Sequence, residues 1–383
     1  MSSRIVIVAL AVGGCFALSG APALAVDDDD PEGQEAADLE ERVAELEATT
    51  ARKGNLRIGA GFSQVRLPGQ ILFGSKFVPL RLEGENGVTR FVPAPIAESE
   101  QTQDGENFNA SASLPTGFFL PGTEIQIDFS NTTFDGASSG FVPIGGRDVA
   151  YPYIKPLKLP DGGESTGIAA GNTGTDATGR SDGEIFDWTG AFTFPLGGFR
   201  GLIGARYTNF EWNNDVNLTS RTFSDLNQGT WMKQESDWWG AVFGVQFERL
   251  PEQGFTYGAD FRWGLGQLDS NGTVRQVTHA GPLGKDNPEF RVRQSQNLSA
   301  NDFSMIFGGS AHVGWRFWPS LELRLEGSVE QMTDVPFINF TYTPDLQPVR
   351  FGFGDLTEAT IGGRLIWRLG RLHYHGRAVA QDY

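Results

Sequence analysis

The chain has 383 residues and a formal net charge of −17, with 50 Gly, 29 Phe and 9 Trp but a single Cys. This negative charge argues against a nucleic-acid partner, which needs Lys and Arg to neutralise its phosphates. Glycine and aromatic residues at this level suit a twisted, turn-rich β structure better than a helical one.

Residues 1–25 have the pattern of a secretory signal peptide. Arg4 precedes an apolar run, and Ala23-Leu24-Ala25 forms a small-x-small cleavage site. The alternative interpretation is a membrane-spanning helix, but the apolar run is too short to cross a bilayer. Cys15 follows two glycines in a pattern that loosely resembles a lipoprotein box, but cleavage after Ala25 is the better match. Cleavage there leaves no cysteine, so no disulfide is expected to stabilise the mature chain.

Residues 26–33 form an acidic linker, and residues 34–53 are rich in Ala, Glu, Leu and Arg. Leu39, Val43 and Leu46 follow the 4-then-3 spacing of a coiled-coil seam. Because so short a coiled coil is marginal alone, it is expected to pair with a second copy of the chain or with another surface. The alternative is a solvated acidic helix that acts as a spacer.

From Gly54 onward the hydrophobic period falls to about 2 residues, the period of a β-strand. Ten segments alternate in this way, at 56–62, 108–114, 125–129, 186–194, 203–207, 239–247, 255–265, 303–317, 321–330 and 359–367. Short turns follow the second, fourth, sixth and eighth segments. Longer connections follow the odd-numbered ones, and these include loops at 134–183 and 269–302.

Short turns on one side and long loops on the other are typical of outer-membrane β-barrels. The sequence therefore predicts an all-β fold: a transmembrane, antiparallel up-and-down β-barrel of about ten strands over residues 54–370. Residues 371–383 are expected to be a tail or an extra strand. If they paired with a strand at residues 71–82, the barrel would have twelve strands. A spanning helix would need about 18 consecutive apolar residues, and the mature chain has no such run.

The strongest segments each have one apolar and one charged face. The chain has a predicted secretory signal peptide, no cysteine after its cleavage and loops of unequal length at the two ends. The apolar face is therefore expected to meet outer-membrane lipid, and the charged face is expected to line the lumen. The expected lumen-lining residues are Arg206, Glu248, Asp260, Arg262, Arg316, Glu322, Arg324, Glu326, Glu330, Glu358, Arg364 and Arg368. Opposite charges in a narrow barrel most often pair into a network that fills it. In a channel, the same charges would set selectivity.

No catalytic residue, metal site or cofactor is predicted. His373 and His375 could share one strand face, but no third metal ligand is near them in the sequence. His279 lies in a predicted long loop, where it could act as a general base. No serine stands in a nucleophile elbow, and the mature chain has no cysteine nucleophile.

The region from about Gly54 onward resembles Gram-negative outer-membrane β-barrels in its alternating strands and unequal turns. More narrowly, residues 199–207 and 311–327 look like matching hairpins of the ten-stranded omptin proteases. Omptins use paired aspartates on one rim and an Asp-x-His pair on another, whereas here Val277 stands two residues before His279. The resemblance therefore implies an omptin-type architecture, whereas omptin proteolysis would need an Asp-x-His pair that His279 does not supply.

The sequence thus predicts an outer-membrane barrel that acts as a small porin-like channel, with residues 34–53 as a periplasmic oligomerising helix. A second hypothesis is an omptin-like surface hydrolase whose site lies in loops 135–183 and 269–302. The third is a filled barrel that anchors a structural tether in the envelope, with residues 26–53 as the reaching arm.

Overall fold

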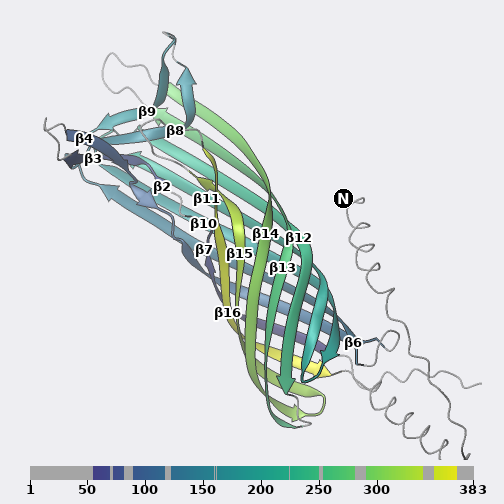
Figure 1. Cartoon of the computed structure of the whole chain (residues 1–383). Helices are drawn as coiled ribbons and strands as arrows, with labels where there is room; N and C mark the ends of the chain where they lie inside the picture. Colours follow the sequence, from purple (N-terminus) through teal and green to yellow (C-terminus); the bar gives the residue numbers. More distant parts are fainter. Residues whose placement is uncertain are drawn as a thin grey trace, which may run out of the picture.

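The computed structural model describes residues 55–368, except for 70–71, 82–88, 117–121, 159, 161, 224, 250–252, 281–289 and 340–348. Within this part of the chain, ten long strands form a closed antiparallel barrel (Figure 1). They are β1 (Asn55–Arg66), β6 (Thr102–Pro115), β7 (Glu124–Val142), β10 (Thr175–Leu196), β11 (Phe199–Ser220), β12 (Asn227–Arg249), β13 (Gly254–Ala280), β14 (Phe290–Trp318), β15 (Leu321–Asn339) and β16 (Arg350–Arg368). The ring closes because β1 pairs with both β6 and β16.

These strands confirm the predicted all-β barrel and its ten strands, one for each alternating segment. The twelve-strand alternative is wrong, because the region around residues 71–82 forms β2 (Leu72–Phe73) and β3 (Ser75–Arg81), which pair outside the barrel. The predicted tail at 371–383, the signal peptide, the linker and the coiled-coil helix with its seam lie outside the described residues.

The predicted strands are too short at the end where the long loops were expected. Much of 134–183 and 269–302 belongs to strands, since β7 continues to Val142, β10 begins at Thr175 and β13 continues to Ala280. The physical reason is visible on β13, where the outward residues change from apolar to polar after Leu265 while the alternation itself continues. A search for strands with one apolar face stops at that change.

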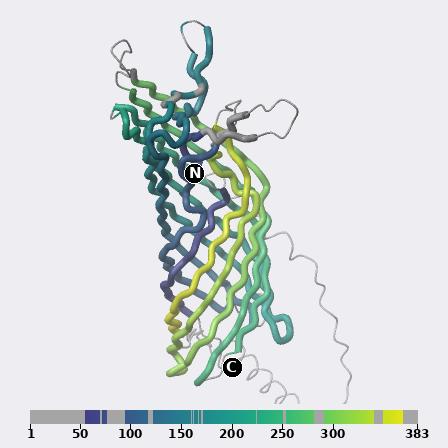
Figure 2. The backbone as a smooth tube through the Cα atoms, turned by 90° about the vertical axis from the view of Figure 1, so that its left-hand side faces the viewer, coloured from purple at the N-terminus to yellow at the C-terminus, as the bar shows by residue number. Residues whose placement is uncertain are grey.

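The two ends of the barrel differ. Short connections join β10 to β11 and β14 to β15 at one end, which we call the turn end. Gly197, in the first of these turns, has a φ of 60°, a left-handed conformation that glycine adopts without strain. The opposite end, which carries the longer connections, is the loop end. Figure 2 shows the strands tilted as they run between the two ends.

Two small sheets lie at the loop end (Figure 1). One has the order β4-β3-β8-β9, with β4 (Thr89–Ala94), β8 (Val149–Lys158) and β9 (Glu164–Gly171). The other pairs β2 with β5 (Ala97–Glu98). Among the described residues, no helix is long and apolar enough to cross a membrane.

The two faces of the barrel wall have opposite character near the turn end. On β15, Leu323 and Leu325 point outward and are about half exposed, whereas Glu322 and Arg324 point inward and are buried. The same division holds on β13, where Phe255 is exposed and the neighbouring residue Thr256 is buried. Strand alternation therefore places apolar side chains outside and charged side chains inside.

Candidate functional site

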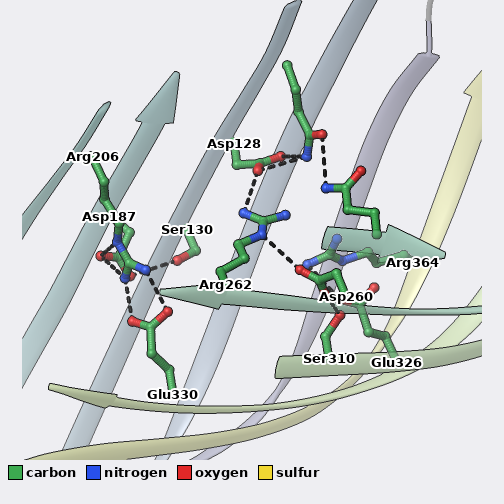
Figure 3. Close-up of polar contacts among 12 residues, drawn as sticks. Asp128, Ser130, Asp187, Arg206, Asp260, Arg262, Ser310, Glu326, Glu330 and Arg364 are labelled. Carbon is green, nitrogen blue, oxygen red and sulfur yellow. Dashed lines mark hydrogen bonds and ion pairs between the residues drawn. The ribbon is translucent and has the colours of Figure 1, made fainter. Parts of the chain in front are cut away.

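Arg206 on β11 lies at the centre of one ionic network inside the barrel (Figure 3). Its Nη2 donates to Asp187 Oδ1 at 2.7 Å, and its guanidinium also forms an ion pair with both carboxylate oxygens of Glu330. Thr208 donates a further hydrogen bond to Asp187. Glu330 lies on β15, four strands from β11 around the ring, so this pair crosses the interior.

Arg262 on β13 forms a second network of the same kind (Figure 3). Its Nη1 donates to Asp128 Oδ2 on β7 and its Nε to Asp260 Oδ2, both at 2.8 Å. Gln126 donates to both oxygens of Asp128 at 2.9 Å. Because β7 and β13 are also four strands apart, Arg262 joins opposite walls of the barrel.

Glu322 is the centre of a cluster at the turn end. Its carboxylate has no solvent exposure and forms ion pairs with three arginines, Arg316, Arg324 and Arg368, the first and last at 3.2 Å. Thr256 donates a hydrogen bond to it at 2.8 Å. Such a carboxylate can remain buried because several cations and a donor compensate its desolvation. We call these five residues the turn-end cluster.

The remaining predicted acids have different partners. Glu326 pairs with Arg364 at 3.2 Å, and Glu248 pairs with Arg324. Glu358 on β16 accepts hydrogen bonds from the hydroxyls of Ser63, Thr132 and Thr360, which come from β1, β7 and β16.

A cavity of about 210 Å³ lies among these groups, and all ten barrel strands contribute to its wall. Nine of the twelve sequence-predicted residues line it, and Arg316, Glu322 and Arg368 lie in the turn-end cluster instead. The ionisable groups of the wall are Arg57, Asp128, Asp187, Arg206, Glu248, Asp260, Arg262, His312, Arg324, Glu326, Glu330, Glu358 and Arg364. Seven carboxylates thus face five guanidinium groups, so the cavity is highly polar and close to electrically balanced.

Three charged residues of the cavity wall were not predicted to line the lumen: Arg57, Asp128 and Asp187. Each stands between two apolar residues of a predicted strand, as Asp187 does between Phe186 and Trp188. The alternation was therefore sufficient to place them inside. Within the described part of the chain, Arg57 has no ion pair with any carboxylate.

An apolar layer fills the barrel on the loop-end side of the cavity. One inward side chain from each of the ten strands contributes to it, and none is more than 4% exposed. Nine of these side chains are apolar, and the tenth is the amide of Gln103, which donates to the hydroxyl of Ser181. The layer consists of Val65, Gln103, Phe134, Ile185, Phe210, Trp238, Leu268, Ile306, Met332 and Leu356. On three strands a layer residue lies two positions nearer the loop end than a charged residue of the cavity, as Met332 does relative to Glu330.

Packing within the apolar layer is tight. The rings of Phe134 and Phe210 stack with their centroids 6.2 Å apart, and Trp238 Nε1 donates to the main-chain oxygen of Ser304 at 3.3 Å. A water-filled passage would expose the side chains along it, yet Trp238 and Val65 have no exposed surface. The layer therefore separates the cavity from the loop end.

The histidines do not form a site in the part of the chain that is described. His279 lies on the outward face of β13, between the buried residues Thr278 and Ala280. His312 faces the cavity, with its Nε2 at 3.7 Å from Glu248 Oε1. His373 and His375 lie outside the described residues. No group of three or more His, Cys, Asp or Glu side chains among the described residues could hold a metal ion.

No protein-family model matches the chain, and no curated protein matches it. Among solved structures, it is similar to the outer membrane protease OmpT from Escherichia coli, with 12% identity and a TM-score of 0.43 over 84% of this chain and 98% of that one. It is also similar to a Pseudomonas aeruginosa FadL homologue, with 6% identity and a TM-score of 0.24 over 82% and 90% of the two chains. A third is the translocator domain of the autotransporter NalP from Neisseria meningitidis, with 11% identity and a TM-score of 0.19 over 88% and 98%. These TM-scores lie below 0.5, so the fold itself follows from the strand register described above.

Proposed function

We propose that this chain is an outer-membrane β-barrel with a closed interior, which serves as an anchor in the envelope and does not conduct solutes. The apolar layer carries the proposal, because ten nearly unexposed side chains leave no aqueous passage between the cavity and the loop end. The paired charges on the turn-end side of the apolar layer also support a closed interior, since ion pairs across a narrow barrel fill space that a channel would leave open.

The outer surface supports placement in a membrane. On β13 the outward residues are apolar from Phe255 to Leu265 and polar from Gln267 to Arg275. Residues 255–265 cover about 34 Å at about 3.4 Å per residue. A tilt of about 40° reduces this to a height of about 26 Å, close to the apolar band of about 25 Å in outer-membrane barrels.

Orientation follows from the unequal connections. In bacterial outer-membrane barrels the short turns face the periplasm, so the turn end of this barrel is expected there. β1 begins at Asn55 at the turn end, which puts residues 26–53 on the periplasmic side in this proposal. A helix with a seam at Leu39, Val43 and Leu46 would then be available for self-association or for contact with another envelope component.

The two other hypotheses receive less support. A porin-like channel would need an open path past Trp238 and Phe210, which are at most 1% exposed. An omptin-like hydrolase would need His279 to face a site at the rim, but it lies on the outward face of β13. The loops 135–183 and 269–302, which were expected to hold that site, are largely strand.

Planar-bilayer recording of the folded protein tests the closed interior. We expect no conductance steps from the native chain, and small steps from a variant with Phe134, Phe210 and Trp238 all replaced by Ser. The matched control is Trp239→Ser on the outward face of β12. This variant is expected to give no conductance steps, because the substitution does not change the interior. Regular steps from the native protein would disprove the proposal.

The anchoring role has its own test. Deletion of residues 26–53 should leave the barrel folded, which heat-modifiable migration on a gel would show, and should weaken the envelope in a detergent-sensitivity assay. If cells with the deletion have the same envelope integrity as those with the full chain, the arm has no tethering role.

A further inference from the structure

The central part of β8 lies against the inner wall of the barrel at the loop end. Tyr151 and Ile154 have no exposed surface, and Tyr151 Oη lies 3.1 Å from Thr175 Oγ1 on β10. The flanking residues Gly146 and Gly162 are exposed. A short extended segment is thus buried in the mouth, with an exposed glycine on each side of it.

Glutamine side chains of the wall bind the main chain of this segment. Gln228 on β12 and Gln276 on β13 each donate to the carbonyl oxygen of Pro152 at 3.0 Å. Gln276 also accepts from the main-chain nitrogen of Ile154 at 3.2 Å. Gln294 on β14 donates to the carbonyl oxygen of Lys155 at 2.8 Å and accepts from its nitrogen at 3.4 Å.

A side-chain amide that donates to a C=O and accepts from an N–H replaces the peptide group of a neighbouring strand. β8 needs this replacement because its pairing with β9 is interrupted. The register of the two strands shifts between Pro152 and Leu157, so residues 153–156 have no β9 partners. The wall therefore recognises mainly the backbone of β8, as receptor edges do when they bind an added strand.

We propose that the loop-end mouth is a binding groove for the main chain of an extended, proline-containing peptide, with β8 as its internal occupant and a partner protein's peptide as the exchanging ligand. Tyr151 and Ile154 are fully buried, and the partner's side chains would fill the spaces that these two side chains occupy, one of which offers the hydroxyl of Thr175 as a polar contact. This inference does not rest on the closed interior. Gln276 lies eight residues nearer the loop end than Leu268 of the apolar layer, so emptying the groove leaves that layer in place.

Exchange of β8 after folding tests the groove directly. Protease sites are inserted at Gly146 and Gly162, the full chain is folded and then cut, and a fluorescent peptide with the sequence of residues 147–158 is added. We expect saturable binding of the peptide, release of the cut fragment and unchanged heat-modifiable migration of the barrel. If a large excess of peptide neither binds nor displaces the fragment, the groove does not exchange its occupant and the proposal is wrong.

Two changes test recognition of the main chain. Gln276→Leu removes both the donor and the acceptor that face β8, so the peptide should bind about tenfold more weakly. Gln267→Leu, on the outward face of the same strand, is the matched control and should change affinity less than about twofold. A peptide N-methylated at Ile154 lacks the N–H that Gln276 accepts and should also bind about tenfold more weakly to the unaltered, cut barrel. Equal effects of the two protein variants, or full affinity of the methylated peptide, would show that the side chains alone hold β8.

Discussion

The guanidinium of Arg206 on β11 and the carboxylate of Glu330 on β15 meet across the interior of the barrel, four strands apart in the ring. Arg206 is 8% exposed and is shared with Asp187, which comes from the neighbouring strand β10. One side chain thus compensates two carboxylates from opposite walls. Removing it leaves negative charge with no cation in a region that excludes most water.

We therefore expect Arg206→Gln to destabilise the barrel by about 3 kcal/mol, the lower part of the range for a broken buried ion pair, because Glu330 keeps some contact with water. Urea unfolding in lipid vesicles, followed by tryptophan fluorescence, measures this change. Arg221→Gln is the control, since Arg221 pairs with Asp176 on the surface and should contribute little. Equal destabilisation by both variants would contradict a special role for the interior pair.

Glu322 should be more sensitive than the other acids of the interior. Glu322→Gln leaves Arg316, Arg324 and Arg368 gathered around a neutral amide, so three like charges lose their common partner. We expect a loss of at least about 3 kcal/mol in the same unfolding assay. Glu326→Gln, whose carboxylate pairs with Arg364 alone, should cost less. The reverse order would mean that the turn-end cluster does not stabilise the barrel.

Much of the architecture could be predicted because strand alternation is a local property. Residues such as Phe255 and Thr256 point to opposite faces whatever their neighbours do. The halves of the strands nearest the loop end were not predicted as strand, because outward residues such as Asp269 and Asn271 resemble those of a loop. Their strand structure depends on pairing with neighbouring strands in a closed ring, and that pairing is not encoded locally.

The charged interior was predicted residue by residue, but its pairings were not. Arg262 and Asp128 are far apart in sequence, and only the circumference of a ten-stranded barrel brings them together. The apolar layer was also missed, because Phe210 and Trp238 lie where the sequence suggested a loop between two shorter strands. Their inward direction follows only once β11 and β12 are known to continue past that point.

Trp238 should stabilise the barrel as well as close it. It has no exposed surface and packs in the apolar layer, so Trp238→Ala should create a cavity and cost about 3–5 kcal/mol in urea unfolding. Trp239→Ala, on the outward face of β12 and 42% exposed, should cost clearly less. If the two substitutions are equivalent, the inward tryptophan is not packed as tightly as its burial indicates.

Gly183 on β10 should tolerate no side chain, because the ring of Phe134 occupies the space beside it. A Cβ atom at Gly183 would collide with that ring and would lie 2.6 Å from the main-chain oxygen of Glu211. Gly183→Val should therefore destabilise the barrel by about 1–3 kcal/mol through overpacking, measured by urea unfolding. Gly190→Val is the control on the same strand, since the nearest atom to its Cβ is 3.3 Å away in the side chain of Trp188, which is exposed and can move. A double variant, Gly183→Val with Phe134→Leu, should recover part of the loss, because the smaller side chain frees space for the new methyl groups. No recovery would indicate that the collision with Glu211, and not the packing of the apolar layer, determines the cost.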